Sequence, residues 1–464
     1  MGHVNPLATL LLSSGREERL AIQAGHDSWT YARLAACSAD LATALGARGV
    51  KPGDRLVVQT GKRPEVIALH LASVRLGAVY VPLNSAYTQA EVEALVADAD
   101  PALVVRDDVL DDLLAQPGDG SFEDTPRALD DPASMLYTSG TTGRPKGAVL
   151  TQGNLIAACR TLVDAWGFTD DDVLLHILPL FHTHGLFVAA YCTLASGASM
   201  VMVDFEPARV VRELPNATVL MGVPTHYTRL LAEPSFTGEA TQGIRLFTSG
   251  SAPMLVGTHE EFTARTGQVI LERYGMTETC MLTSNPLRGQ RRPGTVGPPL
   301  PGVEVRVVEG DAIQVSGPNV FAGYWGRPEL RETEFTDDGW FITGDLGRFD
   351  SDGYLEIFGR SKDLVITGGL NVYPKEVESV LDALPGVLES AVIGLPDPDF
   401  GEAVTAVVVP EPGAALDADE IRRQAREHLA AFKVPKAVHV VDELPRNAMG
   451  KVEKTRLRAE WGRT

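Results

Sequence analysis

Apolar, strand-like runs that alternate with helix-like stretches constrain the fold of this chain more than any other feature of its sequence. From residue 55 to residue 204, runs such as residues 56–60 and 79–83 alternate with helical patterns such as residues 64–76. The middle runs, for example residues 173–180, are apolar throughout. Strands that are apolar on both faces are typical of parallel sheets covered by helices on both sides. The sequence therefore predicts an α/β fold with parallel-rich sheets and flanking helices.

Two further changes in the sequence pattern indicate how the chain is divided. Between Gly294 and Asp345, short strand-like runs are punctuated by glycine and proline, which predicts a β-rich subdomain. After Arg360, helical and strand-like patterns alternate over about one hundred residues, enough for an independent α+β domain. We therefore predict a large N-terminal domain over residues 1–360 and a small C-terminal domain over residues 361–464.

Charge and cysteine content argue against several classes of function. The chain has 464 residues, with 41 Lys and Arg against 61 Asp and Glu, and a net charge of −20. A field of that sign repels nucleic acids and anionic lipids, so we expect neither nucleic acid nor membrane as a partner. The four cysteines are far apart and form no CxxC pair, which argues against a zinc ribbon or a disulfide framework. No apolar run reaches the ~18 residues of a membrane span and no targeting segment is visible, so we predict a cytoplasmic protein.

The strongest local signal is a loop rich in glycine and hydroxyl side chains at residues 137–147. It follows an apolar run and precedes an expected helix. Backbone N–H groups, hydroxyls and an ammonium group in such a loop can hold phosphate oxygens. Pro145 and Gly147, on either side of Lys146, rule out a Walker A loop. The predicted phosphate-binding residues are Thr138, Ser139, Gly140, Thr141, Thr142, Gly143 and Lys146.

This loop resembles the signature loop of the adenylate-forming superfamily, which contains acyl-CoA synthetases, luciferases and peptide-synthetase adenylation domains. Further motifs of that superfamily follow in its order at residues 181–185, 249–253, 274–278, 344–345, 359–363, 368–371 and 445–451. The resemblance covers nearly the whole chain. It implies a ligase that uses ATP, Mg²⁺ and CoA. A carboxylate attacks the α-phosphorus of ATP, pyrophosphate leaves, and CoA then takes the acyl group from the acyl-adenylate.

The resemblance also assigns roles to single residues. Lys451 bridges the substrate carboxylate and the nucleotide during adenylation, Glu278 helps to hold Mg²⁺, and His182 is a gate between the acid and the thiol channel. The implied nucleotide-binding residues are Gly250, Ser251, Ala252, Tyr274, Gly275, Met276, Thr277, Asp345 and Arg360. His182 and His184 also suggest a metal pair, but a catalytic zinc site usually has three protein ligands and no His-Glu-x-x-His motif is present. A hydrogen-bonded loop histidine stays open as the alternative for His182.

The C-terminal domain is expected to turn between the two steps, because one arrangement cannot present Lys451 for adenylation and also admit a thiol. By resemblance, Lys362 is the hinge, and Gly368 and Gly369 reach the CoA channel, where a missing Cβ allows close approach of the backbone. The N-terminal domain then carries the acid and ATP sites, and the mobile C-terminal domain carries the catalytic lysine. A protein lysine acetyltransferase acting on Lys451 is a further candidate partner.

The acid is predicted from a helix that begins at Pro224. Thr225 and Arg229 stand at i and i+4 and share a face, so Arg229 faces the acid if Thr225 does. A guanidinium there can bind a second carboxylate, and a solvated helix arginine is the alternative. The residues around these positions look most like those of the malonyl-CoA synthetases within the superfamily. The implied acid-binding residues are Thr183, Arg229, Met281 and Arg292, with either arginine a candidate for the distal carboxylate of malonate or methylmalonate.

Three other interpretations stay open. An amino-acid adenylation enzyme usually carries an aspartate where His182 stands, and a medium-chain or aryl acyl-CoA synthetase would want an apolar residue in place of Arg229. A nucleotide-binding scaffold that has lost catalysis predicts damaged catalytic positions, whereas Lys146, Glu278 and Lys451 are all present. We therefore predict an ATP-dependent ligase that converts malonate, and also methylmalonate, with CoA to the acyl-CoA, AMP and pyrophosphate.

Overall fold

The computed structural model describes residues 5–12, 15–138, 145–447 and 450–462. By contacts between residues, the chain divides into two compact units. Unit 1 comprises Met1–Val305 and Val315–Phe341, and unit 2 comprises Arg306–Gln314 and Ile342–Thr464. A grouping by contact does not say which segment turns, so the domain boundary between residues 360 and 361 stays a prediction.

Unit 1 contains a six-stranded sheet in the order β16-β7-β6-β4-β3-β5. Its strands are β3 (Arg55–Val58), β4 (Val79–Pro82), β5 (Leu103–Val105), β6 (Pro132–Thr138), β7 (Lys146–Thr151) and β16 (Gly323–Tyr324). Strands β3 to β6 run parallel, and β7 and β16 pair antiparallel. Helix α4 (Gln89–Ala99) packs on this sheet, where Val57 and Val81 share a core with Val92.

The second sheet of unit 1 has eight strands in the order β13-β12-β11-β10-β8-β9-β1-β2. Its strands are β1 (Leu20–Ala24), β2 (Asp27–Thr30), β8 (Val173–His176), β9 (Ser199–Met202), β10 (Val219–Gly222), β11 (Leu246–Ser249), β12 (Leu271–Tyr274) and β13 (Thr283–Ser284). The strands from β12 to β1 run parallel, and β2 and β13 pair antiparallel at the edges.

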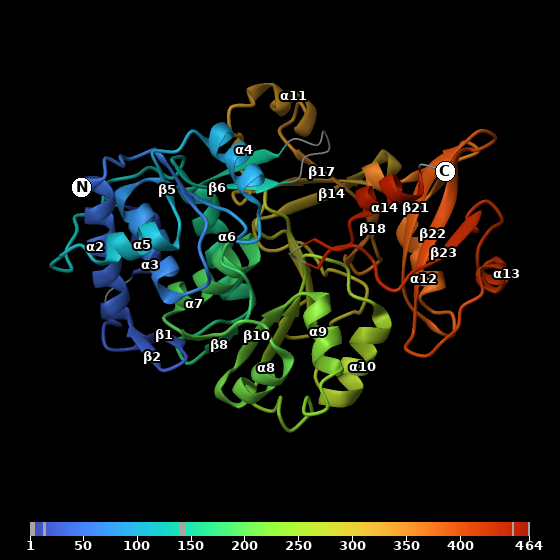
Figure 1. Cartoon of the computed structure of the whole chain (residues 1–464), viewed down its shortest axis with the longest axis horizontal. Coiled ribbons are helices and arrows are strands. Elements are labelled where there is room, and N and C mark those ends of the chain that lie inside the picture. The colour runs from blue at the N-terminus through green and yellow to red at the C-terminus, as the bar shows by residue number, and fades with distance from the viewer. Residues whose placement is uncertain (1–4, 13–14, 139–144, 448–449, 463–464) are drawn as a thin grey trace. The chain divides into compact units, whose positions relative to one another are not determined.

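Helices flank both sheets of unit 1. They are α1 (Pro6–Leu11), α2 (Tyr31–Ala47), α3 (Pro64–Leu76), α4, α5 (Asp107–Leu114), α6 (Gln152–Ala165), α7 (Tyr191–Ser196), α8 (Pro207–Glu213), α9 (Pro224–Leu231), α10 (Val256–Thr266) and α11 (Arg331–Glu334). Helices α8 and α9 lie side by side and pack against each other (Figure 1). The parallel-rich sheets and flanking helices confirm the predicted α/β fold.

Local sequence accounts for the ends of two of these helices. Helix α3 begins at Pro64, which fits the first turn, and ends before Gly77, whose φ of 80° is a left-handed conformation that glycine adopts without strain. Helix α4 begins after Thr88, and the side chains of Thr88 and Glu91 form the predicted capping box. Both helix starts were predicted, and the structure confirms them.

Two local expectations are wrong. The apolar run at residues 173–180 is a strand only as far as His176. The carbonyl oxygen of His176 accepts a hydrogen bond at 2.8 Å from Lys62 Nζ, a long-range contact that the local pattern does not contain. The predicted phosphate loop is followed by strand β7 and not by a helix, because the apolar residues after Lys146 pair with β6. Helix α6 begins only at Gln152.

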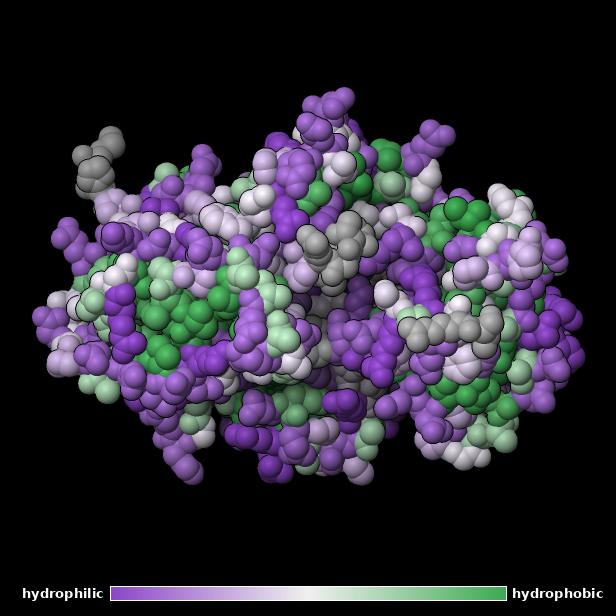
Figure 2. Space-filling model, turned by 45° about the horizontal axis from the view of Figure 1, so that its top comes forward, coloured by the Kyte–Doolittle hydropathy of each residue, from purple (hydrophilic) through white to green (hydrophobic). Residues whose placement is uncertain are grey.

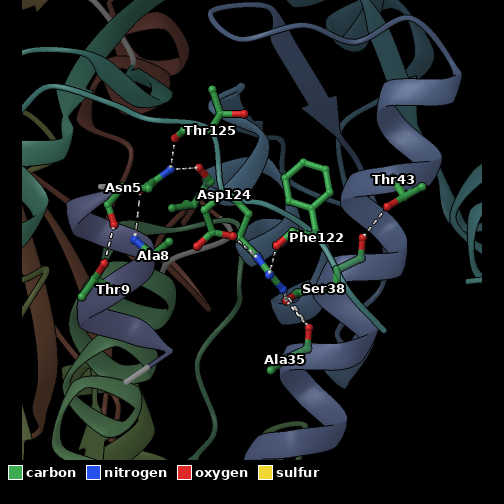
Figure 3. Close-up of polar contacts among 12 residues, drawn as sticks. Asn5, Ala8, Thr9, Ala35, Ser38, Thr43, Phe122, Asp124 and Thr125 are labelled. Carbon is green, nitrogen blue, oxygen red and sulfur yellow. Dashed lines mark hydrogen bonds and ion pairs between the residues drawn. The ribbon is translucent and has the colours of Figure 1, made fainter. Parts of the chain in front are cut away.

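The acidic segment after α5 is tied to the helices beneath it. Arg75 of α3 forms an ion pair with Asp124 at 2.6 Å and donates a hydrogen bond to Ser38 Oγ of α2 at 3.1 Å (Figure 3). Asn5 Nδ2 donates to the carbonyl oxygen of Thr125 at 3.1 Å. This segment was expected to be an exposed loop with a short helix. The short helix is α5, and the loop is held in place by Arg75 and Asn5.

Unit 2 contains a four-stranded sheet in the order β14-β15-β17-β18 and a five-stranded sheet in which β20-β19-β22-β21 are neighbours and β23 pairs with β22. The strands are β14 (Glu304–Val308), β15 (Ala312–Ser316), β17 (Phe341–Phe349), β18 (Leu355–Arg360), β19 (Val365–Thr367), β20 (Leu370–Val372), β21 (Val387–Asp397), β22 (Gly401–Pro410) and β23 (Ala437–Val440). The helices are α12 (Pro374–Leu381), α13 (Ala418–His428) and α14 (Lys454–Trp461). Strand β21 is buried on both faces: Val392 packs with α12 and α13, and Ile393 packs with α14.

The surface drawn in Figure 2 is mostly hydrophilic, and hydrophobic residues form separate patches on it. All four cysteines are free thiols, in agreement with the expectation that no disulfide framework is present. In the described part of the chain, no helix combines the length and apolar character that crossing a membrane requires.

Candidate active site

The carboxyl ends of the parallel strands in the eight-stranded sheet bring several predicted motifs to one edge. Strand β11 ends at Ser249, β12 ends at Tyr274, and β8 is followed by the loop that holds His182 and Thr183. Loops at the carboxyl ends of parallel strands meet on the same side of a sheet, which is where α/β proteins bind ligands. Motifs that are far apart in the sequence therefore adjoin in unit 1.

Arg273 on β12 is the most unusual residue at this edge, and the sequence analysis did not single it out. Its side chain lies in the core, and the residue is only 4% exposed. Its Nε and Nη2 atoms have no hydrogen-bond partner in the described part of the chain. Burial lowers the pKa of the guanidinium to about 10. A signal was present in the sequence, since Glu272 and Arg273 interrupt an apolar strand-like run that begins at Val269.

Gly250 shows how closely Arg273 approaches the neighbouring strand end. A Cβ placed on Gly250 would lie 2.5 Å from the guanidinium carbon of Arg273, so only glycine leaves room for that side chain. Thr248 pairs with Leu271 across strands β11 and β12. Because side chains alternate along a strand, Thr248, Gly250 and Arg273 lie on the same face of the sheet.

Further polar groups without partners surround Arg273. Thr183 Oγ1, Thr248 Oγ1 and both ring nitrogens of His184 are buried and have no hydrogen-bond partner among the described residues. Burial lowers the pKa of His184 well below its usual value, and the neighbouring Arg273 lowers it further. His184 is therefore neutral near pH 7. We call Thr183, His184, Thr248 and Arg273 the buried polar cluster, and it can accept a polar or anionic ligand.

The predicted gate residue His182 borders this cluster. Its Nδ1 atom accepts a hydrogen bond from the backbone N–H of His184 at 3.2 Å. Burial lowers the pKa of His182 to about 4, and the charge of Arg273 adds to the shift. The imidazole is therefore neutral and has one ring nitrogen occupied. Its role as a gate stays a prediction.

The phosphate side of the candidate site is described only in part. Ser139, Gly140, Thr141, Thr142 and Gly143 lie outside the described residues. Thr138 and Lys146 end and begin strands β6 and β7 and pair directly in their register.

Lys146 and Glu278 are linked through Tyr324. Lys146 Nζ forms an ion pair with Glu334 Oε1 at 2.6 Å and lies 5.0 Å from the ring centroid of Tyr324. The Tyr324 hydroxyl donates a hydrogen bond at 3.0 Å to Glu278 Oε1, and Glu278 is 5% exposed. The structure thus brings the predicted phosphate-binding lysine close to the predicted Mg²⁺ ligand. Sequence reasoning missed Glu334 and Tyr324, because nothing in the local pattern connects them to the loop.

The predicted nucleotide-binding loops after β11 and β12 have constrained backbones. Ser251 has a φ of 69°, a left-handed conformation that is uncommon for residues other than glycine. A Cβ on Gly275 would lie 2.1 Å from the carbonyl oxygen of Cys280, so glycine is required there. The neighbouring positions of this predicted set are Ala252, Tyr274, Met276 and Thr277. Strain at such positions is common at functional sites, which is consistent with a binding role for these loops.

In unit 2, Asp345 and Arg360 pair with each other across strands β17 and β18. Arg360 Nε lies 2.8 Å from Asp345 Oδ1, and the Asp345 side chain is 5% exposed. Both residues were predicted to contact ribose, and the structure places them side by side.

The predicted catalytic lysine, Lys451, is in a tight turn of unit 2. The backbone N–H of Lys451 donates to Asn447 Oδ1 at 3.0 Å, and Gly450 has a φ of 73°. The Lys451 side chain is exposed, yet the surrounding protein displaces enough water to lower the pKa of its ammonium to about 8, and the charge of Arg360 lowers it further. Lys451 therefore titrates within the range in which enzymes are assayed.

The predicted hinge and channel residues follow one another in unit 2. Lys362 is an exposed residue of a short 3₁₀ turn, Ser361–Asp363, directly before β19. Gly368 and Gly369 form the two-residue turn between β19 and β20, with φ values of 56° and 78°. Only glycine adopts two successive left-handed conformations without strain, so the hairpin itself requires both residues. Roles as a hinge and in CoA binding stay predictions.

The four predicted acid-binding residues are not all brought together. Thr183 belongs to the buried polar cluster. Met281 is 1% exposed and lines a small cavity with Leu300. Arg229 is exposed on α9, whose start at Pro224 is confirmed. Arg292 is half-buried, and its Nη2 atom donates to Gln290 Oε1 at 3.4 Å. The roles of these residues stay predictions.

Comparison with known proteins agrees with the expected relationship. The AMP-binding enzyme profile matches residues 13–325, and the AMP-binding enzyme C-terminal domain profile matches residues 376–451. The chain is 36% identical over 472 residues to feruloyl-CoA synthase from an Amycolatopsis species, covering 95% of this chain and 96% of that protein. It is 35% identical over 525 residues to malonate–CoA ligase from Arabidopsis thaliana, covering 95% and 86%.

A solved structure gives the same result over nearly the full length. ATP-bound MatB from Rhodopseudomonas palustris is 49% identical to this chain, with a TM-score of 0.96 and 99% of both chains covered. The family profile matches more than half of the chain, and the ordered motifs fall inside or beside the matched segments. This chain therefore belongs to the AMP-binding enzyme family, within the adenylate-forming superfamily.

Proposed function

We propose that this enzyme joins malonate, and also methylmalonate, to CoA with hydrolysis of ATP to AMP and pyrophosphate, through an acyl-adenylate. The similarity to malonate–CoA ligases and to ATP-bound MatB supports this substrate. Similarity alone does not decide the acid, because a feruloyl-CoA synthase is 36% identical. The character of the buried residues at the sheet edge has to decide it.

The observation that carries the proposal is the buried polar cluster. Ferulate would bring an aromatic ring to the cluster and leave its hydroxyl and imidazole groups desolvated without partners. Each buried polar group without a partner costs roughly 1–3 kcal/mol. Malonate instead brings a second carboxylate, which accepts hydrogen bonds from hydroxyl and N–H donors. A short dicarboxylate therefore fits this cluster better than an aryl or medium-chain acid.

In the adenylation step, the protein gathers positive charge around the reacting groups. One carboxylate of malonate attacks the α-phosphorus of ATP, and the bond to pyrophosphate breaks. We assign Lys146 to the phosphates that leave and Lys451 to the oxygens shared between acid and nucleotide, where charge develops in the transition state. Asp345 and Arg360 are assigned to the ribose.

Mg²⁺ is proposed as the metal of this step, and the residues present fit it. Among the described residues, no cluster of three or more His, Cys, Asp or Glu can hold a metal ion. Mg²⁺ is commonly held by one or two carboxylates together with substrate phosphates, so the single buried carboxylate of Glu278 suffices. When bound, the ion neutralises charge on the phosphates.

In the second step, the thiol of CoA attacks the acyl carbonyl carbon and AMP leaves. We propose that unit 2 residues after Lys362 turn to allow this, that Gly368 and Gly369 then line the CoA channel, and that His182 opens the way for the thiol. A neutral His182 is consistent with this role, since it adds no charge to the thiol path.

Location and regulation are proposed on simpler grounds. Four free cysteines support a reducing compartment such as the cytoplasm. An exposed Lys451 with a pKa of about 8 supports modification by a protein lysine acetyltransferase, because more of its amine is unprotonated than in an ordinary lysine.

The test is acyl-CoA formation with ATP, Mg²⁺ and CoA across malonate, methylmalonate, succinate, acetate, octanoate and ferulate. We expect malonate to have the highest kcat/KM, with methylmalonate next. A higher kcat/KM for ferulate or octanoate would refute the proposed acid and leave the family assignment intact.

A further inference from the structure

The charge of Arg273 has no compensation within the described part of the chain. A guanidinium is not deprotonated at neutral pH, and even the lowered pKa of about 10 leaves Arg273 charged. The residue is 4% exposed, and no ion pair with a carboxylate is formed by it. A buried charge without a partner is strongly unfavourable. A binding anion would remove that penalty.

The nearest carboxylate in the sequence, Glu272, cannot supply the missing charge. Successive side chains of a strand point to opposite faces, so Glu272 and Arg273 face away from each other. Glu272 Oε1 instead accepts a hydrogen bond from the backbone N–H of Gly294 at 3.1 Å. Tyr227, which is coupled to Arg273, uses its hydroxyl to donate to the carbonyl oxygen of Thr248 at 2.6 Å.

The two unpartnered nitrogens of Arg273 define the shape of the missing ligand. Nε and Nη2 form one edge of the planar guanidinium, and their N–H bonds run parallel. A carboxylate accepts two such parallel hydrogen bonds at once, one on each oxygen. The hydroxyls of Thr183 and Thr248 are also without partners and can donate to the same oxygens. The neutral His184 adds no competing charge.

We propose that Arg273 binds the distal carboxylate of the acid substrate through Nε and Nη2, and so determines that the enzyme selects a dicarboxylate. This inference rests on the proposed function and assigns to Arg273 the role that the sequence suggested for Arg229 or Arg292. A monocarboxylate of the same shape leaves the guanidinium buried and unpaired, and the enzyme discriminates against it for that reason.

The test compares malonate with 3-methylbutanoate, in which two methyl groups take the place of the distal carboxylate oxygens. Arg273→Met should lower kcat/KM for malonate at least ~100-fold, while kcat/KM for 3-methylbutanoate stays unchanged or rises. Arg291→Met is the matched control, since Arg291 is a half-buried arginine that donates to the carbonyl oxygens of Pro286 and Leu287. Loss of Arg291 should change both acids by the same factor. An equal loss of both acids in Arg273→Met, or unchanged malonate activity, would overturn the inference.

Two measurements keep the test decisive if Arg273→Met folds poorly. Arg273→Lys keeps the charge but loses the two-pronged edge, so the ratio of malonate to 3-methylbutanoate kcat/KM should fall about tenfold, and an unchanged ratio would overturn the inference. In the absence of ligands, removal of an unpaired buried charge should leave Tm unchanged or higher, whereas a structural role predicts a lower Tm. If the wild-type enzyme prefers ferulate to malonate, the proposed function itself fails, and that outcome is separate from the behaviour of either variant.

Discussion

Two cations, one in each unit, are held in opposite ways. Arg273 of unit 1 is buried in a sheet, fixed against Gly250, and has guanidinium nitrogens without partners among the described residues. Lys451 of unit 2 is exposed on a tight turn and titrates near pH 8. The first arrangement suits selection of a ligand, because the cost of the buried charge is present until the right anion arrives. The second suits a single chemical step, because an exposed lysine can be supplied and withdrawn.

The largest expected effect tests the unit 2 side of this comparison. Lys451→Ala should lower the rate of acyl-adenylate formation about 1,000-fold, because one charge aimed at the transition state is lost. Formation of the thioester from supplied malonyl-adenylate should change by less than about threefold. Pyrophosphate release and thioester formation are measured separately.

Lys454→Ala is the control for Lys451→Ala, since Lys454 is nearby in sequence and forms an ion pair with Glu378 at 2.6 Å. It should leave both half-reactions within about threefold of the wild type. Equal losses of both half-reactions in Lys451→Ala would contradict the assignment of this lysine to adenylation alone.

The next effect concerns the turn between the two steps. Lys362→Pro restricts φ at the predicted hinge, so thioester formation should fall about 100-fold while adenylation stays near the wild-type rate. Lys362→Ala removes the side chain without restricting the backbone and should retain both half-reactions. Normal thioester formation in Lys362→Pro would show that the chain turns elsewhere.

The pH dependence of adenylation separates the two cations directly. Lys451 must be protonated to stabilise negative charge, and its pKa of about 8 is lowered from the ordinary value. As pH rises through 8 the lysine loses its proton, so kcat/KM for adenylation should fall about tenfold per pH unit above that point. In Lys451→Arg this fall should be absent up to pH 10. An unchanged profile in that variant would assign the fall to another group.

The smallest expected effect concerns Arg229, the arginine that the sequence suggested for the distal carboxylate. It is exposed on α9, and exposed ion pairs contribute only about 0.2–1 kcal/mol. Arg229→Met should therefore lower kcat/KM for malonate less than about fivefold, far less than Arg273→Met. A loss of 100-fold or more confined to malonate would return the carboxylate site to α9.

Local physics explains which parts of the structure could be predicted from the sequence. Pro64 at a helix start and the capping box at Thr88 are determined by neighbouring residues, so both were predicted correctly. The end of β8 at His176 depends on Lys62, which is 114 residues away, and no local pattern contains that contact. Arg273 was missed for the same reason. Its significance lies in the absence of a partner, which only the folded chain reveals.

The ion pair between Lys146 and Glu334 changes what ATP gains on arrival. The lysine is already neutralised by a carboxylate of its own chain, at 2.6 Å. A phosphate oxygen that takes this lysine has to displace Glu334, so the contact is an exchange of one anion for another. Its contribution to ATP affinity is then the difference between two ion pairs, and Glu334 acts as an internal competitor. An enzyme built in this way holds its phosphate-binding lysine in order while ATP is absent and releases the nucleotide product readily once the phosphates have left.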